Sequence, residues 1–295
     1  MLVSVIIPVH KTILFFKSCI ESVLNQTYDN LEIIIACNGG LEIKACEEFL
    51  NINDSRVVYI KTKDGRHNAR NEALNTAKGD WIQFLDYDDY LFPNKIEVQL
   101  TSLLKKNNSE LCICKWKKFT QNIDEHYTFL FQKLFDKNQI CADELVQKLG
   151  ESRGFIATSS WLVKSNIVHG LKWIDSPNDD AVFFSEMLKK QPHFIMVPEI
   201  LAGYRIHNDN TSSLRTKQEF DKLFVSWKVI ARNLSVFKNK GKYHYLYTAF
   251  LNLITYSKQI NRHKFFVVLF YTIFYAYKAE IGISMLYDLK KKVFK

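Results

Sequence analysis

The chain of 295 residues predicts an α/β fold built on a parallel, doubly wound sheet. Continuous apolar runs rich in β-branched residues are typical of buried parallel strands, and several occur early in the chain. The expected strands are residues 2–8, 32–36, 57–60 and 81–85. Segments with helical periodicity, residues 15–26 and 68–77, alternate with these strands. This alternation favours crossover helices that connect neighbouring strands of one sheet.

A cluster of carboxylates follows the last of these strands. The run Asp86-Tyr87-Asp88-Asp89 would lie at the carboxyl end of the strand, where open α/β sheets bind ligands. Mg²⁺ and Mn²⁺ are commonly held by one or two carboxylates together with substrate phosphates, so this pattern suits a metal-bound diphosphate. The alternative is a solvated acidic turn that caps a helix opened by Pro93. These residues alone leave both interpretations open.

Short motifs then occur in a fixed order along the chain. They are residues 4–9 (SVIIPV), 22–28 (SVLNQTY), 32–35 (EIII), 69–71 (ARN) and 79–89 (GDWIQFLDYDD). Together these motifs resemble the nucleotide-sugar glycosyltransferases of family 2, which have the GT-A fold. Two later motifs, Asn178-Asp179-Asp180 and Tyr204-Arg205-Ile206-His207-Asn208, extend the resemblance to about residue 213.

The resemblance implies an organisation for the whole chain. We expect a GT-A catalytic domain at residues 1–213, with a nucleotide-binding half (1–104) and an acceptor-side half (105–213). A basic, aromatic-rich and mainly helical C-terminal region would follow at residues 214–295.

The acceptor-side half gives weaker local signals. We expect a strand at residues 110–116, a helix at residues 142–149 and a further strand that begins near Ser159. Trp161 and Trp173 could stack on a sugar face, but buried packing is the default for aromatic side chains.

The resemblance also implies roles for the acidic run. Asp88 would ligate a Mn²⁺ or Mg²⁺ ion that bridges the donor phosphates, with Asp89 close by. Asp86 and Tyr87 would lie beside the nucleotide, Asp86 near the ribose. His207 resembles a late histidine that completes the metal or phosphate contacts, and a structural or solvent-exposed histidine is the alternative. A bound cation would act as a Lewis acid for the departing diphosphate.

A second pair of carboxylates supplies the candidate general base. Transfer of a sugar requires a base that takes a proton from the attacking hydroxyl, and Asp180 is the candidate by position, with Asp179 as the second choice. Adjacent carboxylates at a helix N-terminus also complement the helix dipole, and this structural interpretation is compatible with catalysis. The family is inverting, which implies one in-line displacement without a covalent enzyme intermediate.

The nucleoside side departs from the common family pattern. The family commonly shows Asp-Asp-Gly-Ser after the second strand, whereas this chain has Cys37-Asn38-Gly39-Gly40. The Asn38 amide both accepts and donates, whereas a carboxylate only accepts from the uracil N3 group, so uridine is expected but base selectivity stays open. Pro8-Val9-His10 would contact the nucleoside. Arg70 resembles an arginine whose fork suits phosphate or carbonyl recognition, and a surface arginine is the alternative.

Positive charge and aromatic residues gather at the C-terminal end. Residues 214–295 hold 16 Lys and Arg against 4 Asp and Glu, a net charge of +12, whereas the whole chain carries +9, which leaves −3 for residues 1–213. The most apolar stretch, residues 265–277 (FFVVLFYTIFYAY), is too short for a transmembrane helix, which needs about 20 residues. This composition favours an interfacial helix on an anionic membrane. A core helix and a homodimer contact are the alternatives.

The remaining composition indicates the cellular setting. Met1 precedes the first strand almost directly, which disfavours a removable signal peptide, and the 6 cysteines lack zinc-ligand spacing. We therefore expect a cytoplasmic protein, peripheral on the inner face of the plasma membrane. No nucleic-acid-binding module is recognised, so the positive charge does not predict a nucleic-acid partner.

These observations predict an inverting, metal-dependent glycosyltransferase. It would move a hexose or N-acetylhexosamine from a UDP-sugar to a hydroxyl of a bacterial surface glycan, of lipopolysaccharide, lipooligosaccharide or capsule type. The alternative is a noncatalytic, membrane-associated scaffold of the same fold in a glycan-assembly complex. A nucleotidyltransferase is disfavoured because no glycine-rich phosphate loop with a lysine follows the first strand, and a dehydrogenase because Gly-x-Gly-x-x-Gly is lacking. The sugar, the linkage and the acceptor are not predicted.

Overall fold

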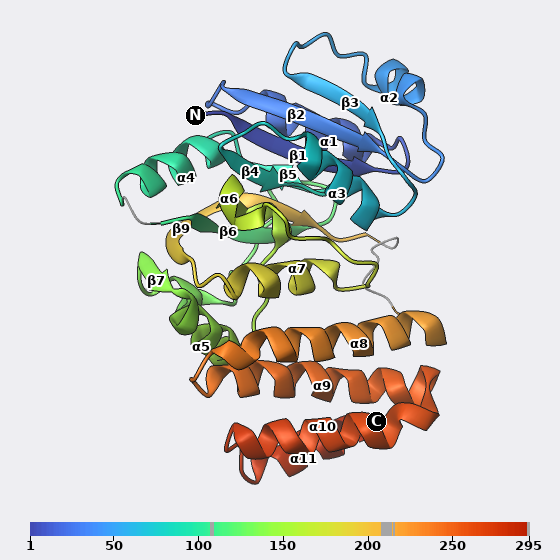
Figure 1. Ribbon diagram of the computed structural model, residues 1–295, viewed down its shortest axis with the longest axis vertical. Coiled ribbons are helices and arrows are strands. Elements are labelled where there is room, and N and C mark those ends of the chain that lie inside the picture. Colours follow the sequence, from blue (N-terminus) through green and yellow to red (C-terminus); the bar gives the residue numbers. More distant parts are fainter. Residues whose placement is uncertain (107–108, 208–213, 215, 294–295) are drawn as a thin grey trace. The chain divides into compact units, whose positions relative to one another are not determined.

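The computed structural model describes residues 1–106, 109–207, 214 and 216–293 (Figure 1). The chain divides into two compact units that are discontinuous in sequence. Unit 1 comprises residues 1–140, 156–175 and 192–208, and unit 2 comprises residues 141–155, 176–191 and 209–295. Two segments from the expected acceptor-side half therefore group with the C-terminal helices, and the expected boundary after residue 213 lies outside the described residues.

Unit 1 is built on one mixed sheet. Within the described residues it has nine strands in the order β3-β2-β1-β4-β8-β6-β9-β5, with β7 paired to β9. The bounds are β1 Val3–Val9, β2 Leu31–Cys37, β3 Val57–Lys61, β4 Trp81–Phe84, β5 Tyr90–Leu91, β6 Leu111–Phe119, β7 Gln139–Cys141, β8 Trp161–Lys164 and β9 His193–Arg205.

The first four strands form the predicted parallel half of the sheet. Val5 of β1 pairs with Ile33 of β2 on one side and with Gln83 of β4 on the other. All residues of β1 are buried, as expected of a strand covered on both faces. Because parallel strands end at the same edge, the loops that follow β1, β2 and β4 begin close together.

The other half of the sheet is mixed, so the prediction of a parallel sheet does not extend to it. β8 is antiparallel to both β4 and β6, and β5 is antiparallel to β9. Tyr90 of β5 pairs with Gly203 of β9. Because of this pairing, the residues at the end of β9 reach the acidic run that precedes β5.

The helices of unit 1 agree closely with the sequence analysis. They are α1 Leu14–Leu24, α2 Ile43–Leu50, α3 Arg66–Thr76, α4 Lys95–Leu104 and α6 Ser165–Val168, with 3₁₀ turns η1 Gln132–Phe135 and η2 Thr158–Ser160. Both predicted helices, α1 and α3, lie within two residues of their expected bounds. The strand expected near Ser159 begins at Trp161, after the η2 turn.

A buried polar network holds β4 against α4. The ammonium group of Lys95 donates to the side-chain oxygens of Gln83 and Gln99, the latter at 2.6 Å, and to the carbonyl of Trp161 at 3.2 Å. An ammonium group has three donors, and these three acceptors match them. Burial lowers the pKa of Lys95 from 10.5 to about 8. The network thus fixes the strand that leads into the acidic run.

Unit 2 is helical. Its helices are α5 Ala142–Ser152, α7 Asp179–Leu188, α8 Lys217–Asn233, α9 Gly241–Ile260, α10 Phe265–Lys278 and α11 Ser284–Val293, with 3₁₀ turns η3 Leu234–Val236 and η4 Arg262–Lys264. Helix α9 is central, because α5, α8, α10 and α11 all pack against it (Figure 1). The Phe250 ring of α9 lies 6.1 Å from that of Phe224 on α8 and 5.2 Å from that of Tyr275 on α10.

Helices α5 and α9 approach each other at two glycines. A Cβ atom on Gly150 would lie 2.1 Å from the carbonyl oxygen of Gly241, and one on Gly241 would lie 2.3 Å from the Cα of Gln147. Real Cβ atoms do not come this close, so both positions require glycine. This contact ties the inserted helix α5 to the C-terminal helices.

Candidate active site

The acidic run lies where the sequence predicts, directly after β4. The amide of Leu85 donates to the carbonyl of Ile6 at 3.0 Å, which continues the ladder one residue beyond the strand. The chain then turns, and the amide of Asp89 donates to the carbonyl of Asp86 at 3.0 Å. The four residues of the run therefore form a tight turn at the carboxyl edge of the parallel half.

The turn contacts His207, two residues beyond the end of β9. The Nε2 atom of His207 lies 2.6 Å from Oδ2 of Asp88, and both side chains are largely buried. Burial and the nearby Asp86 raise the pKa of Asp88, and the hydrogen bond with His207 opposes that shift. The Phe15 ring lies 5.4 Å from the His207 ring. The structure thus brings together two of the three predicted metal ligands.

Arg205 anchors the same turn from β9. Its backbone amide donates to Oδ1 of Asp89 at 3.0 Å, and its Nε donates to the carbonyl of Asp88 at 2.8 Å. The guanidinium carbon lies 4.4 Å from the ring centre of Phe15 and 4.3 Å from that of Phe119. A delocalised cation between two aromatic rings is favourable and restricts the side chain. Arg205 therefore fixes the acidic turn relative to β9.

Asp89 is buried, unlike a side chain that is open to a ligand. Burial raises its pKa well above the ordinary aspartate value, with further increases from Asp88 and Asp86. Its carboxylate accepts from the amide of Arg205, and this hydrogen bond and the Ser159 side chain oppose that rise in pKa. These contacts give Asp89 a structural role at the turn, and direct metal contact stays a prediction.

Asp86 belongs to a second cluster on the same turn. Arg70 of α3 forms an ion pair with Asp86, and its guanidinium lies 4.4 Å above the ring of Trp173. The Asn71 side chain makes two hydrogen bonds with the Trp173 backbone. Nδ2 of Asn71 donates to the Trp173 carbonyl at 2.9 Å, and the Trp173 backbone N–H donates to Oδ1 of Asn71 at 2.8 Å. Arg70 is buried, so the alternative of a surface arginine is wrong. Its ion pair is with a carboxylate, and recognition of a donor phosphate or carbonyl stays a prediction.

The predicted nucleoside residues lie at the ends of β1 and β2. Pro8 and Val9 are buried in β1, and the Asn38 side-chain amide donates to the carbonyl of Val9 at 2.9 Å. His10 is exposed, and its ring meets the edge of the Tyr87 ring at 5.2 Å. Asn38 therefore holds the end of β1, and the contact of His10 with Tyr87 joins that end to the acidic turn. Nucleoside binding by these residues stays a prediction.

Asp179 and Asp180 lie in unit 2, at the start of α7. The amide of Asp180 donates to Oδ1 of Asp179 at 3.0 Å, and the amide of Ala181 donates to Oδ1 of Asp180 at 2.8 Å. Asp179 is buried and Asp180 is partly exposed. Each carboxylate thus accepts from the amide of the next residue, whereas the N-cap of α7 is Asn178, which makes no side-chain capping hydrogen bond. Two carboxylates in the first helical turn complement the helix dipole, as the structural interpretation expects, but they do not cap the helix.

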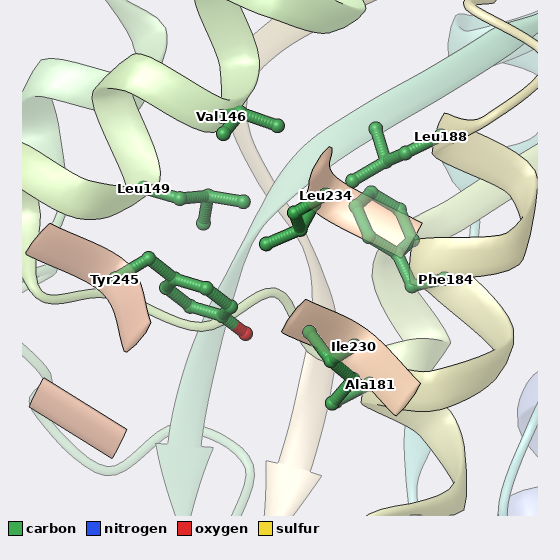
Figure 2. Close-up of a pocket in the computed structure, with 8 residues that line it drawn as sticks. All are labelled: Val146, Leu149, Ala181, Phe184, Leu188, Ile230, Leu234 and Tyr245. Carbon is green, nitrogen blue, oxygen red and sulfur yellow. The ribbon is translucent and has the colours of Figure 1, made fainter. Parts of the chain in front are cut away.

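A cavity lined in part by Ala181, next to this pair, is a packing void. Its volume is about 20 Å³, and its lining comes from four helices and one 3₁₀ turn of unit 2 (Figure 2). The lining residues are Val146, Leu149, Ala181, Phe184, Leu188, Ile230, Leu234 and Tyr245. A void of this size holds about one water molecule, which excludes it as a sugar site.

Three residues of the site have contacts that were not predicted from the sequence. Arg205 stood inside the Tyr204-Arg205-Ile206-His207 motif, yet received no role. Trp173 was expected to pack in the core, which is confirmed, but its contact with Arg70 was not anticipated. Phe15 carries no local signal, because only the fold brings α1 to the end of β9.

The described residues offer limited coordination to a metal ion. They contain no group of three or more His, Cys, Asp and Glu side chains placed to hold one. Asp88 and His207 supply one carboxylate and one imidazole, and the other carboxylates of the turn bind Arg70 and Arg205. This donor pair fits Mn²⁺ or Mg²⁺ only if a bound diphosphate and water complete the coordination, as is usual for ions held by few protein ligands.

Comparison with known proteins identifies the class. A family model described as "Glycosyl transferase family 2" matches residues 4–166, more than half of the chain, and the chain belongs to this family. Solved structures of the first 349 residues of Staphylococcus aureus TarS share the fold. The complex with UDP-GlcNAc gives a TM-score of 0.63 at 12% identity, over 86% of this chain and 81% of the TarS 1–349 chain. The complex with UDP gives a TM-score of 0.64 at 11% identity, over 95% of this chain and 89% of the TarS 1–349 chain. The predicted GT-A fold is therefore confirmed.

Several curated relatives are also similar in sequence. An uncharacterized glycosyltransferase of Methanocaldococcus jannaschii is 30% identical over 72% of this chain and 75% of its own. Glycosyltransferase GlyG of Streptococcus pneumoniae is 25% identical over 77% of this chain and 75% of its own. Glycosyltransferase GlyA of the same species is 24% identical over 73% of this chain, but the match spans only 32% of GlyA. The chain therefore corresponds to about a third of that relative.

Proposed function

We propose that this protein transfers a hexose or N-acetylhexosamine from a UDP-sugar to a hydroxyl of a bacterial surface glycan or its lipid-linked precursor. The observation that carries the proposal is the contact between Asp88 and His207 at the carboxyl edge of a family 2 fold. Fold neighbours that were solved with UDP and with UDP-GlcNAc support a nucleotide-sugar donor.

Asp88 and His207 would hold a divalent cation together with the donor diphosphate. A bound cation stabilises the negative charge that develops on a leaving diphosphate. Arg205 keeps the turn in place through the Asp88 carbonyl and the Asp89 carboxylate. The ion pair of Arg70 with Asp86 orients the carboxylate that we assign to the ribose.

The reaction would be a single in-line displacement with inversion. The acceptor oxygen attacks the anomeric carbon, and the bond from that carbon to the diphosphate oxygen breaks with its electron pair on the diphosphate. Asp180 would take the proton of the acceptor hydroxyl, with Asp179 as the second candidate. Asp180 is the better placed of the two within unit 2, because its side chain is partly exposed whereas Asp179 is buried.

The alternative, a noncatalytic scaffold of the same fold, makes a different prediction for turnover. Purified protein with Mn²⁺ should release UDP from at least one member of a panel of UDP-hexoses and UDP-N-acetylhexosamines, because transferases commonly hydrolyse their donor slowly. The change Asp88→Ala should remove that release. The matched control is Asp29→Ala, which removes an exposed carboxylate of unit 1. No UDP release from any donor, with UDP binding retained, would favour the scaffold.

A further inference from the structure

One face of helix α10 is apolar and open to solvent. Phe266, Phe270 and Tyr277 are 76%, 65% and 78% exposed, and Ile273 and Phe274 between them are also exposed. Their spacing of three and four residues places them along one side of the helix. Residues 265–277 contain no charged side chain, so no charge interrupts this face. Large aromatic side chains in such a row are unusual on a surface that contacts only water.

The opposite face of α10 already completes the packing of unit 2. Val268, Thr272 and Ala276 are buried on the side that faces α9. The Tyr271 ring on α10 lies 5.1 Å from the Phe250 ring of α9. Because this buried face supplies the helix contacts, the exposed row is not needed for folding of the unit.

The next segment of the chain adds more exposed apolar groups. Ile283, in the turn after α10, is 85% exposed, and Leu286 and Tyr287 on α11 are 61% and 71% exposed. Lys290 and Lys291 follow on the same helix and are exposed. Exposed apolar side chains are thus followed by exposed lysines in this segment, and this combination is typical of an interfacial helix.

The acidic side chains of this segment form ion pairs or hydrogen bonds with other residues of unit 2. Glu280 lies 2.6 Å from the ammonium of Lys240, and Asp288 accepts from the Tyr247 hydroxyl at 3.0 Å and lies 3.4 Å from Arg153. At the end of α10, the ammonium of Lys278 lies 5.9 Å from the Phe274 ring centre. A cation beside an exposed aromatic row is the arrangement in which lysine reaches lipid headgroups while its stem stays apolar. The surface is therefore complementary to an anionic one.

We propose that α10 and α11 form an interfacial anchor that binds the surface of an anionic lipid bilayer. Helix α10 would lie in the membrane plane, with Phe266, Phe270 and Tyr277 among the headgroups and acyl chains and with Lys290 and Lys291 near lipid phosphates. Within the described residues no helix is long and apolar enough to cross a membrane. The proposal goes beyond the transfer reaction and does not depend on it.

Vesicle binding by the full chain tests the anchor. The probes are vesicles of phosphatidylglycerol and phosphatidylcholine in equal parts and vesicles of phosphatidylcholine alone, in a sedimentation assay. Phe266→Glu with Phe270→Glu should weaken the partition coefficient by about 100-fold or more, because two aromatic side chains no longer enter the interface. The matched control, Val225→Glu with Val236→Glu, adds the same charge at exposed apolar positions on α8 and η3 and should bind as the wild type does.

Two further variants separate the contributions. Lys290→Gln with Lys291→Gln should bind anionic vesicles roughly tenfold more weakly and neutral vesicles unchanged. Lipids brominated in the acyl chains should quench the fluorescence of the tryptophan introduced by Phe270→Trp. They should not quench that of the tryptophan introduced by Val225→Trp. This fluorescence test keeps an apolar residue at position 270, so it holds even if the glutamate variant fails to fold.

The results that would overturn the anchor are also specific. Equal vesicle binding by the wild type and a folded Phe266→Glu, Phe270→Glu variant would exclude it, as would an unquenched Phe270→Trp. Light scattering would test the alternative that a second copy of the chain covers this face. A wild-type dimer that does not bind vesicles, and that Phe266→Glu with Phe270→Glu converts to a monomer, would assign the face to that second copy.

Discussion

The side chains of Asp88 and His207 lie 2.6 Å apart although 118 residues separate them in the sequence. The contact exists because β5 pairs antiparallel with β9, so that the turn before one strand meets the residues after the other. A carboxylate and an imidazole in contact at the carboxyl edge of a parallel sheet form the core of the proposed donor site.

The first prediction concerns this pair. Asp88→Ala should abolish Mn²⁺-dependent turnover and Mn²⁺-dependent UDP affinity with the fold intact, because the diphosphate loses its bridging cation. His207→Ala should raise the Mn²⁺ concentration for half-maximal UDP release by roughly 10- to 100-fold, the usual range for weakened metal sites. His193→Ala, at the exposed start of β9, is the control. Full activity of the Asp88 variant with Mn²⁺ would disprove the metal assignment.

The second prediction tests the two hydrogen bonds between the Asn71 side chain and the Trp173 backbone. Asn71→Ala removes two hydrogen bonds to the Trp173 backbone and should destabilise the protein by about 2–4 kcal/mol, because two buried polar groups lose their partner. Loosening Trp173 also frees Arg70, so the KM for the donor should rise more than kcat falls. Urea unfolding and donor kinetics measure the two effects.

Asn68→Ala is the matched control for that change. Asn68 lies on the same helix, and its side chain donates to the carbonyl of Asp64 at 2.7 Å in an exposed position. Its loss should cost at most about 0.5 kcal/mol, as for most surface substitutions. Equal destabilisation by both variants would show that the two Asn71–Trp173 hydrogen bonds stabilise the protein no more than an exposed hydrogen bond does.

The third prediction concerns the candidate base. Asp180→Asn should reduce transfer by roughly 10²- to 10⁴-fold, the range for loss of a general base, while donor binding changes little. Asparagine keeps the side-chain oxygen that accepts from the Ala181 amide, so this contact at the start of α7 is retained. Equal losses of donor affinity and rate would indicate a structural role. If Asp179→Asn is the more damaging change, the base is the buried partner instead.

The sequence predicts the parallel half of the fold because the signals for its strands lie within short, local segments of the chain. Each of its strands consists mainly of apolar residues, and only Leu85 separates the carboxylates from the end of β4. Buried parallel strands and turn carboxylates are among the clearest signals that a single sequence provides. The position of the acidic turn could therefore be predicted from the residues alone.

The remaining features depend on contacts that no local pattern records. β8 is a four-residue strand, and nothing in its sequence distinguishes antiparallel from parallel pairing. The contact of Trp173 with Arg70 joins α3 to a segment with no regular structure. The grouping of α5 with the C-terminal helices depends on the close approach at Gly150 and Gly241. Nothing in the sequence around either glycine indicates that the two helices contact each other.

The last prediction uses the buried lysine below β4. Burial lowers the pKa of Lys95 to about 8, so between pH 8 and 10.5 the unfolded chain holds a proton that the folded protein has lost. The unfolded state then binds more protons, and this lysine makes the free energy of unfolding rise with pH across that window, by about 3 kcal/mol at most. Below pH 8 both states are protonated and the lysine adds no slope.

Urea unfolding of the wild type and Lys95→Met, at pH values from 7 to 10.5 with reductant present, would measure this rise. The neighbouring thiols oppose it, because burial raises the pKa values of Cys112 and Cys114, the latter to about 11. The difference between wild type and variant largely cancels their contribution, so it should increase with pH above 8. A difference that stays flat would mean that Lys95 keeps its proton in the folded protein, held by the oxygens of Gln83, Gln99 and Trp161.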